Sequence, residues 1–279
     1  MTPFDYCERL AKEHYENFPV GWFIPERLRK YVYALYAFAR TADDFSDEKV
    51  EPSALRLNHL QEWEDRLKAA VQGRADHPIF EALQQTFRET PLPPQLLADL
   101  LVAFRWDVTK TRYQNYAELE EYCRYSANPI GRAVLLLFGY TDPQLLALSD
   151  QICTGIQLVN HWQDIAVDWQ KGRVYLPDED LKKFHYSCDD LEAHRVNDPF
   201  RELMRFELDR TRRLFTAGRP LLNALSRRLR WQIELMWGGP MRILEKIEAV
   251  DYDIFQHRPR LTKRDLAKLF LAKRLQRWR

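Results

Sequence analysis

Glycine is scarce in this chain, which has nine glycines among its 279 residues. Alternating runs of Val and Thr, typical of strands, are also few, whereas apolar residues recur at helical spacing along much of the sequence. No stretch rich in Gly, Ser and Pro interrupts these patterns as a linker would. We therefore expect an all-α protein that forms a single domain over residues 1–279, long enough to bury one continuous core.

An excess of charge of one sign is also missing. The chain has 42 basic and 41 acidic residues, which argues against a nucleic-acid binder as a whole, because such domains carry a clear basic excess. No run of about 18 uncharged apolar residues is present that would span a membrane. The first 19 residues carry charges where a signal peptide needs an apolar core. We therefore expect a cytoplasmic protein.

Cysteine pairs and the common catalytic motifs are missing as well. The cysteines lack CxxC spacing, which disfavours a zinc site and a disulfide framework; they are Cys7, Cys123, Cys153 and Cys188. P-loop, GxGxxG, GxSxG and HExxH patterns do not occur, so the usual nucleotide-binding and hydrolase interpretations have no support. Polar residues that interrupt apolar helices are the remaining indication of a site.

Apolar periodicity and the punctuation by Gly and Pro predict a series of helices. They run over residues 4–17, 26–46, 53–71, 78–88, 94–109, 117–138, 143–169, 199–225, 228–250 and 262–278. The predicted helices at 26–46 and 143–169 differ from the others, because each carries carboxylates close to its apolar side.

The first unusual feature is the sequence RTADDFSDE at residues 40–48, which follows an apolar run. On a helical wheel of about 100° per residue, Asp43 falls in the apolar stripe and Asp47 on its flank, whereas Asp44 and Glu48 point further out. The stripe consists of Leu28, Val32, Leu35, Tyr36 and Ala39. Two carboxylates about 6 Å apart and shielded from water repel each other, unless a cation lies between them or one is protonated.

The second feature is the segment GIQLVNHWQDIAVDWQ at residues 155–170. A polar stripe occupies an arc of roughly 80° on the wheel: Cys153, Gln157, Asn160, Asp164 and Asp168. Apolar residues cover much of the remaining surface: Ile152, Ile156, Leu158, Val159, Trp162, Ile165, Ala166, Val167 and Trp169. A helix that is apolar on nearly all sides is buried, so the narrow polar stripe is expected to face an internal cavity.

Together the two helices supply hard oxygen ligands of the kind that Mg²⁺ prefers, alongside waters and substrate phosphate oxygens. We therefore expect a Mg²⁺ site whose ligands are Asp43, Asp47, Asn160, Asp164 and Asp168. Mg²⁺ held in this way typically neutralises a diphosphate, and cations beside both stripes would complete an anion clamp. These cations are Arg40, Lys171 and Arg173.

A solvated surface is the simpler interpretation of either acidic cluster alone, because charged residues normally lie outside the core. A second pair at the same spacing on a mostly apolar helix favours the metal-diphosphate interpretation. His14 and His161 have no metal-ligand partner at helical spacing, so we expect them to pack or to form hydrogen bonds. The alternative from another functional class is a helical scaffold or lipid-binding protein, whose acidic stripes pair with internal Arg and Lys.

These motifs resemble those of the squalene and phytoene synthase family, head-to-head prenyl transferases with an all-α isoprenoid synthase fold around a central cavity. The sequence ARTADDFSD at 39–47 is similar to the family's first aspartate-rich motif. The second motif is similar to QLVNHWQDIAVD at 157–168, followed by KGRVYLP at 171–177. Two further stretches, YCRYSANPIG at 122–131 and DYDIFQHRP at 251–259, extend the resemblance over nearly the whole chain.

The resemblance implies that the aspartates bind Mg²⁺ bridging the diphosphate of a farnesyl-type substrate. Ionisation then leaves a carbocation in a cavity walled by apolar and aromatic side chains. The resemblance places Tyr125, with the aspartates, among the catalytic residues, and Gln157 and Arg258 among the residues that bind substrate. Asn128 joins the catalytic candidates where the chain departs from the family pattern, because capture of the cation by water needs a polar group beside an apolar pocket. The Asn128 amide is a candidate for guiding water into the pocket, although Asn128 and Pro129 can equally serve only to bend a helix.

The sequences HYENFP (14–19), SANPIGR (126–132) and NHWQD (160–164) are most similar to the hydroxysqualene synthase branch of bacterial hopanoid pathways. That branch is expected to convert presqualene diphosphate and water to hydroxysqualene and diphosphate. The alternative within the family is condensation of two farnesyl or geranylgeranyl diphosphates to presqualene diphosphate, squalene or phytoene. The resemblance also implies cooperation with other enzymes of squalene and hopanoid synthesis.

The carboxyl-terminal stretch, residues 258–279, holds nine basic residues and one acidic residue. Apolar side chains lie among them: Leu266, Leu269, Phe270 and Trp278. One interpretation is a terminal packing helix with a solvated basic face. The other is a peripheral membrane helix that meets anionic headgroups and brings the site near the lipid that holds substrate and product.

Overall fold

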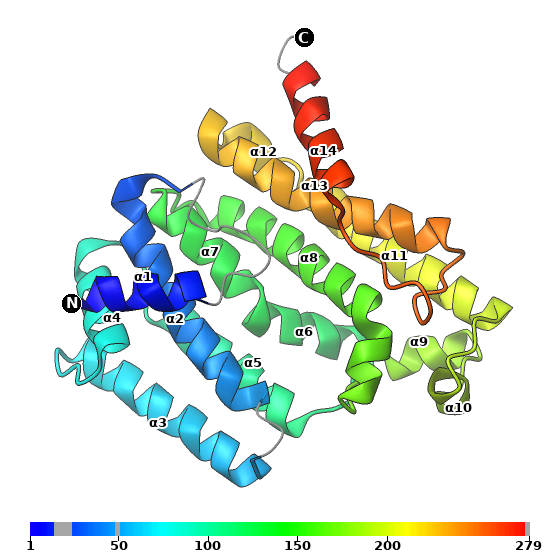
Figure 1. Ribbon diagram of the computed structural model, residues 1–279, viewed down its shortest axis with the longest axis horizontal. Coiled ribbons are helices and arrows are strands. Elements are labelled where there is room, and N and C mark those ends of the chain that lie inside the picture. The colour runs from blue at the N-terminus through cyan, green and yellow to red at the C-terminus, as the bar shows by residue number, and fades with distance from the viewer. Residues whose placement is uncertain (14–23, 48–50, 277–279) are drawn as a thin grey trace. The chain divides into compact units, whose positions relative to one another are not determined.

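The computed structural model describes residues 1–13, 24–47 and 51–276 of the chain, with side chains as far as residue 269. All regular elements in these residues are helices (Figure 1), which confirms the all-α prediction. They are α1 (Pro3–Glu13), α2 (Glu26–Asp47), α3 (Ser53–Val71), α4 (Pro78–Glu89), α5 (Gln95–Thr109), α6 (Tyr116–Ser126), α7 (Asn128–Leu137), α8 (Pro143–Gln170), α9 (Asp178–Lys183), α10 (Cys188–Glu192), α11 (Asp198–Gly218), α12 (Leu221–Ala224), α13 (Arg227–Ala249) and α14 (Lys263–Gln276).

The chain divides into two compact units. The first comprises Met1–Lys110 and Arg124–Leu146, and therefore holds α1 to α5 and α7. The second comprises Thr111–Cys123 and Ala147–Arg279, and holds α9 to α14 with most of α6 and α8. The prediction that residues 1–279 form one domain stays a prediction.

In the first unit, α2 packs against α1, α3, α4 and α5. Several alanines of α2 have no exposed surface, which lets neighbouring helices approach closely: Ala34, Ala37 and Ala42. The Phe38 ring stacks on Trp63 of α3 with centroids 5.9 Å apart, and Trp63 meets Phe80 of α4 edge-on at 4.6 Å. These contacts fix the helix that ends at the first aspartate cluster.

In the second unit, α8 packs closely against α11. A Cβ atom at Gly155 of α8 would lie 3.1 Å from the ring of Phe215 on α11, so glycine permits this approach. The Trp162 side chain of α8 is fully buried, and its indole Nε1 donates to Thr211 Oγ1 on α11 at 2.8 Å. Because Trp162 lies two positions before Asp164, this bond fixes the rotation of the helix that carries the second aspartate pair.

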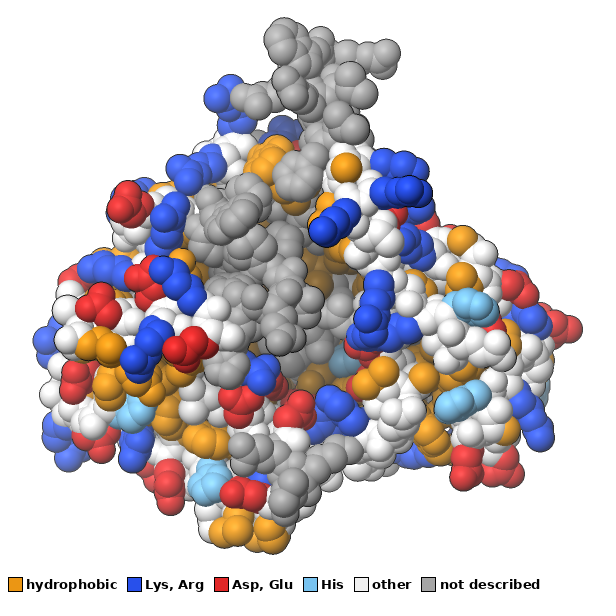
Figure 2. All heavy atoms as spheres, in the orientation of Figure 1, with side chains coloured by type: hydrophobic (Ala, Val, Ile, Leu, Met, Phe, Trp, Pro, Cys, Tyr) orange, Lys and Arg blue, Asp and Glu red, His pale blue; other side chains and the backbone are white. Residues whose placement is uncertain are grey.

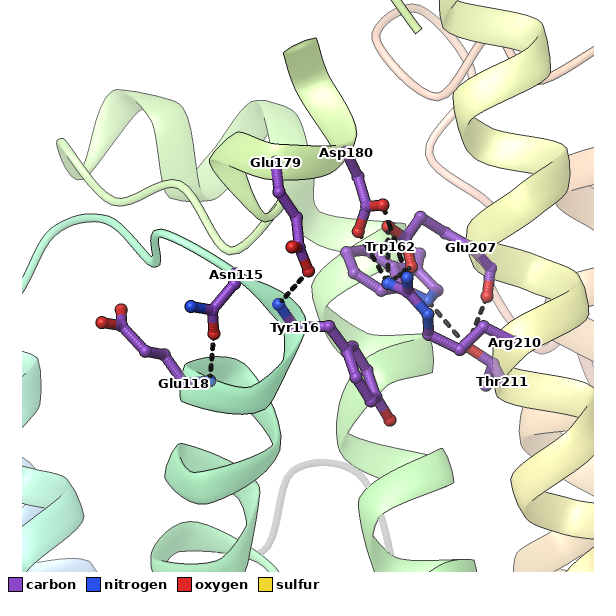
Figure 3. A network of polar contacts seen from close by, with 9 residues as sticks. All are labelled: Asn115, Tyr116, Glu118, Trp162, Glu179, Asp180, Glu207, Arg210 and Thr211. Carbon is purple, nitrogen blue, oxygen red and sulfur yellow. Dashed lines mark hydrogen bonds and ion pairs between the residues drawn. The ribbon is translucent and has the colours of Figure 1, made fainter. Parts of the chain in front are cut away.

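A buried ion network joins α9 to α11 in the second unit (Figure 3). The Arg210 guanidinium donates to Asp180 Oδ2 at 2.8 Å and to both carboxylate oxygens of Glu207, at 3.0 and 3.1 Å. The Glu207 side chain is fully buried and that of Asp180 is 4% exposed. The guanidinium also lies 4.2 Å from the centre of the Tyr116 ring. Burial raises the pKa of Glu207 to about 8, against the opposing effect of Arg210.

Most predicted helix boundaries agree with the structure to within two residues. The predicted helix at 117–138 was wrong, because the chain breaks between Ser126 and Asn128 and continues as a new helix with Pro129 in its first turn. The predicted helix at 199–225 ends at Gly218, and α12 follows as a separate turn. The short helices α9 and α10 were not predicted at all. Residues 14–17 and 277–278 of two predicted helices lie outside the described residues.

The carboxyl-terminal helix α14 packs on α13 through Asp265, whose side chain is 6% exposed. Asp265 forms ion pairs with Arg242 at 3.0 Å and Lys246 at 2.5 Å, and it accepts from the Thr262 backbone N–H at 2.8 Å. The hydrogen bond from Lys246 and those from Thr262 hold the pKa of Asp265 far below its usual value.

None of the described helices combines the length and the apolarity that a bilayer crossing requires.

Candidate functional site

The first aspartate cluster lies in the last two turns of α2. The Arg40 guanidinium contacts two carboxylates at once, Asp43 Oδ2 at 3.3 Å and Asp44 Oδ1 at 2.6 Å. The side chains of Asp43 and Asp44 are exposed to nearly the same extent, 40% and 38%. The prediction that Asp44 points further out than Asp43 was therefore wrong.

Asp47 is exposed, and the prediction that it flanks the core-facing stripe was also wrong. The buried face at this end of α2 runs through Phe38, Ala42 and Ser46, each four residues after the last. Asp43 and Asp47 each follow one of these positions, which turns them about 100° away from the core. This exposure leaves the carboxylates accessible to a hydrated cation. Glu48 lies outside the described residues.

The second polar stripe lies along α8, as predicted. Leu158, Val159, Trp162 and Ile165 are buried, so one broad side of the helix lies in the core, whereas other apolar residues such as Ile156 and Trp169 are only half-buried. The stripe itself is more open than expected, because the Asp164 side chain is 27% exposed and Asn160 is exposed. Asp168 is half-buried. The prediction of a stripe enclosed away from water was therefore wrong at Asn160.

Arg258 forms a two-pronged ion pair with Asp164. Its Nε donates to Asp164 Oδ1 at 2.6 Å and its Nη2 donates to Oδ2 at 2.9 Å. These bonds raise the pKa of Arg258, so the guanidinium is charged throughout the accessible pH range. The residues are 94 positions apart, and sequence reasoning named Arg258 for substrate but missed its contact with this carboxylate.

Gln163, beside Asp164, holds the same part of the chain. Its Nε2 donates to the backbone carbonyl of Pro259 at 2.6 Å. Pro259 is buried, whereas the Arg258 side chain is 36% exposed. Two neighbouring residues of α8 therefore bind two neighbouring residues of the stretch that follows α13.

The end of α8 places the predicted clamp residues Lys171 and Arg173. Gly172 adopts φ +72°, a left-handed conformation that ends the helix, and the Arg173 backbone N–H donates to the Asp168 carbonyl at 2.8 Å. Lys171 is exposed and Arg173 is half-buried. The chain then runs beside residues 111–114, where the Val174 N–H donates to the Thr111 carbonyl at 2.8 Å. The two cations thus follow Asp168 by three and five residues, at the turn that ends α8.

His161 belongs to an aromatic cluster in the second unit, as the packing interpretation predicted. Its ring is 4% exposed and stacks on Tyr175 with centroids 3.7 Å apart. Burial lowers the pKa of His161 to about 3, so the imidazole is neutral near pH 7. The amide Nε2 of Gln157, predicted to bind substrate, lies 3.4 Å from His161 Nε2. Neutral His161 therefore orients Gln157 without adding charge to the stripe.

Tyr125 and Asn128 lie on either side of the break between α6 and α7. The Tyr125 ring meets Trp106 edge-on at 5.8 Å, and the Arg124 guanidinium lies 5.5 Å from the ring centre. Asn128 is the first residue of α7 and is 8% exposed. A polar amide is therefore buried at a helix break, which is compatible both with guiding water and with shaping the backbone.

The donor set fits Mg²⁺ in its chemistry. Each aspartate pair offers carboxylate oxygens on partly or fully exposed side chains, and Mg²⁺ needs only one or two carboxylates beside waters and phosphate oxygens. Within the described ranges, no three or more His, Cys, Asp or Glu side chains are grouped to hold a metal ion. Asp43 and Asp47 belong to the first unit and Asp164 and Asp168 to the second. Their joint action therefore stays a prediction.

Comparison with known proteins identifies relatives over most of the chain. The family model described as squalene/phytoene synthase matches residues 11–265. Hydroxysqualene synthase from Rhodopseudomonas palustris is 36% identical over 248 residues, which cover 87% of this chain and 83% of the relative. Phytoene synthase from Arthrospira platensis is 30% identical over 272 residues, with 91% and 87% covered. The crystal structure of squalene synthase HpnC from Alicyclobacillus acidocaldarius is 40% identical, with a TM-score of 0.85 over 90% of this chain and 94% of that one.

Proposed function

Because the chain belongs to the squalene/phytoene synthase family, we propose that it converts presqualene diphosphate and water to hydroxysqualene and diphosphate with Mg²⁺. The 36% identity with a hydroxysqualene synthase is the observation that carries this choice of reaction. Half-exposed carboxylates on α2 and α8 each pair with an arginine, Asp43 with Arg40 and Asp164 with Arg258. Carboxylates bind Mg²⁺ and arginines bind phosphate oxygens, so this combination supports a diphosphate substrate.

The proposal assigns the metal to Asp43, Asp47, Asn160, Asp164 and Asp168. When bound, Mg²⁺ neutralises the charge that develops on the departing diphosphate. The cations that bind the phosphate oxygens are Arg40, Lys171, Arg173 and Arg258, with Gln157 as a further hydrogen-bond donor. Tyr125 and Asn128 act on the organic part of the substrate.

The deciding experiment is product analysis from presqualene diphosphate with Mg²⁺ and no reductant. Hydroxysqualene in stoichiometric amount with diphosphate is the expected result. Parallel reactions start from farnesyl or geranylgeranyl diphosphate, with and without NADPH. Squalene, phytoene or presqualene diphosphate from these substrates, with no hydroxysqualene from the first reaction, would replace the proposal.

Condensation of two prenyl diphosphates is the second candidate function. The 30% identity with the phytoene synthase of Arthrospira platensis, over 91% of this chain, favours it. The same set of reactions separates the two, because condensation consumes two diphosphates of equal chain length and needs no presqualene diphosphate. Hydroxysqualene, presqualene diphosphate or squalene as the product would place the chain beside other enzymes of squalene or hopanoid synthesis, with which cooperation is part of the proposal.

Replacing Asn128 by Ala is expected to reduce the hydroxysqualene fraction of the product about tenfold. The buried amide would otherwise hold the attacking water, and loss of one such hydrogen bond costs roughly 1.4 kcal/mol. Gas chromatography of the products from presqualene diphosphate measures the fraction. Ser126→Ala is the matched control, because it removes a polar group two residues away. An unchanged hydroxysqualene fraction in Asn128→Ala would restrict Asn128 to a structural role.

The exposed face of α14 and its surroundings support contact with an anionic membrane surface. Lys263, Arg264 and Lys268 are exposed, and Leu266 is 39% exposed among them. Figure 2 shows Lys and Arg side chains gathered around the α13 and α14 part of the surface. Asp265, in contrast, turns into α13 and leaves the outer face without acidic charge. Phe270 and Trp278, which the sequence places among these residues, lie where side chains are not described.

Reversing two of these charges, with Lys263→Glu and Lys268→Glu in one full-length variant, is expected to weaken vesicle binding at least tenfold. Each Lys near an anionic surface contributes about 1 kcal/mol. Co-sedimentation with phosphatidylserine vesicles at low salt measures the change. The variant Arg74→Glu with Arg88→Glu, on an exposed part of the first unit, is the control. Equal binding by both variants and the unchanged protein would refute the membrane role.

A further inference from the structure

Residues 258–262, here called the strap, are the last part of the connection between α13 and α14. On one side the strap is bound to α8, through Asp164 with Arg258 and through Gln163 with the Pro259 carbonyl. The Pro259 carbonyl accepts at 2.6 Å and its side chain is buried, so the backbone next to Arg258 is fixed. The strap therefore presents the Arg258 guanidinium to Asp164 in one direction.

On the other side the strap is bound to α13 and α14. Lys246 Nζ donates to the Arg260 carbonyl at 2.7 Å, and the same ammonium pairs with buried Asp265. The Thr262 backbone and hydroxyl both donate to Asp265 Oδ2, at 2.8 and 2.6 Å. The backbone that follows Arg258 is thus anchored at Pro259, Arg260 and Thr262. The Arg258 side chain itself is 36% exposed and has room to change rotamer.

The ion pair occupies the carboxylate oxygens that a metal would use. Arg258 donates one hydrogen bond to each oxygen of Asp164, which is the planar fork that fits a carboxylate. The same fork fits two oxygens of a phosphate equally well. A cation that takes the lone pairs of Asp164 now used by Arg258 competes with the guanidinium. A displaced guanidinium is then a donor for an anion that arrives with the metal.

We propose that Arg258 is the exchangeable counter-ion of Asp164, and that Gln163 is the positioning residue that keeps it within reach. Without metal, Arg258 neutralises the carboxylate; when Mg²⁺ binds Asp164, the guanidinium transfers to the phosphate oxygens that accompany the metal. Metal binding alone is weakened by this exchange, and binding of metal together with diphosphate is strengthened. The inference rests on the proposed function, because it needs Asp164 to be a metal ligand.

The first measurement is Mn²⁺ binding to the full-length protein without substrate, followed by calorimetry or by electron paramagnetic resonance of the free ion. Arg258→Gln is expected to bind Mn²⁺ about fivefold more tightly, because it removes a competing exposed ion pair. Gln163→Met keeps the volume of the side chain but loses its N–H donor, and is expected to act in the same direction with a smaller change. The control is Arg260→Gln, which also removes one positive charge but lies two residues further along the strap than the arginine that pairs with Asp164. This variant is expected to change Mn²⁺ binding less than twofold.

The second measurement adds inorganic pyrophosphate to the same titration. Arg258→Gln is now expected to bind the Mn²⁺–pyrophosphate pair about tenfold more weakly, because one charge-assisted contact to the anion is lost. Gln163→Met is also expected to bind the Mn²⁺–pyrophosphate pair more weakly, by a smaller factor. A reversal of sign between the two titrations is the signature of exchange, since a purely structural role for Gln163 or Arg258 would change both in one direction.

The outcomes separate the exchange from the function on which it rests. If Arg258→Gln and Arg260→Gln behave alike in both titrations, the exchange is wrong while the metal site stands. If the unchanged protein and Asp164→Asn bind Mn²⁺–pyrophosphate equally, Asp164 is not a ligand and both proposals fall. Binding lost in Asp164→Asn, combined with the sign reversal in Arg258→Gln, supports both.

Discussion

Replacing Asp164 by Asn is expected to lower turnover of presqualene diphosphate by about 10²- to 10³-fold, the effect of removing one group that stabilises developing charge. Asparagine keeps the shape of the side chain but loses the negative charge that attracts both Mg²⁺ and Arg258. Diphosphate release under single-turnover conditions measures the loss. Asp43→Asn on α2 is expected to give a loss of similar size, since both carboxylates are assigned to the same metal-dependent step.

Retained folding distinguishes this loss from simple damage. The ion pair between Asp164 and Arg258 is partly exposed, so its removal is expected to cost at most about 1 kcal/mol of the free energy of unfolding. Asp209→Asn on α11, whose side chain is 54% exposed, is the control and is expected to keep full turnover. Full turnover in both Asp164→Asn and Asp43→Asn would show that these carboxylates do not serve the metal-dependent step. The scaffold or lipid-binding alternative instead predicts no turnover in the unchanged protein.

The long helices could be predicted from the sequence because their apolar periodicity extends over many turns. The boundaries of α2, α3 and α8 agree with the predictions to within one residue. The sequence predicted at most a bend at Asn128 and Pro129 and not a complete break, because the apolar period continues through it and Pro129 occupies a helical first turn that tolerates proline. Helix α10 depends on a capping box at Ser187, a local signal that was present but too short to indicate an element.

The chemistry of the candidate site could be predicted, whereas its electrostatic pairing could not. Repeated carboxylates at a spacing of four residues are visible in the sequence, and they led to Asp43 and Asp164. Arg258 is far from Asp164 along the chain, and only the folded second unit brings the two together. Helical wheels also failed at Asp47, because a shift of one position rotates a side chain by about 100° and the true core face is set by packing.

Replacing Arg210 by Ala is expected to lower the free energy of unfolding by about 3–5 kcal/mol at pH 7, the cost of leaving a buried charge without its partner. Asp180 and Glu207 are nearly inaccessible to water, and Arg210 is the cation that contacts both. The substitution also removes the guanidinium from the Tyr116 ring. Denaturation by urea, followed by circular dichroism, measures the change.

The loss in Arg210→Ala is expected to grow as the pH rises from 6 to 9. Burial raises the pKa of Glu207 to about 8, so its carboxyl is protonated in the folded protein at pH 6 and ionised at pH 9. The folded chain therefore holds a proton that the unfolded chain has released above about pH 4.5, and stability falls as the pH rises through this window. Arg210 opposes the rise in the pKa of Glu207, so without it the pKa in the folded protein goes up further and the fall continues to higher pH.

Arg212→Ala is the control for Arg210→Ala. It separates the loss of the buried network from the general effect of shortening an arginine on α11. Arg212 is also ion-paired, but its partners Asp209 and Glu248 are 54% and 37% exposed, so water can replace the guanidinium. We expect this variant to lose less than about 1 kcal/mol, with no added dependence on pH. Equal losses in the two variants, or a loss in Arg210→Ala that is the same at pH 6 and 9, would contradict a buried network in which one arginine serves two carboxylates.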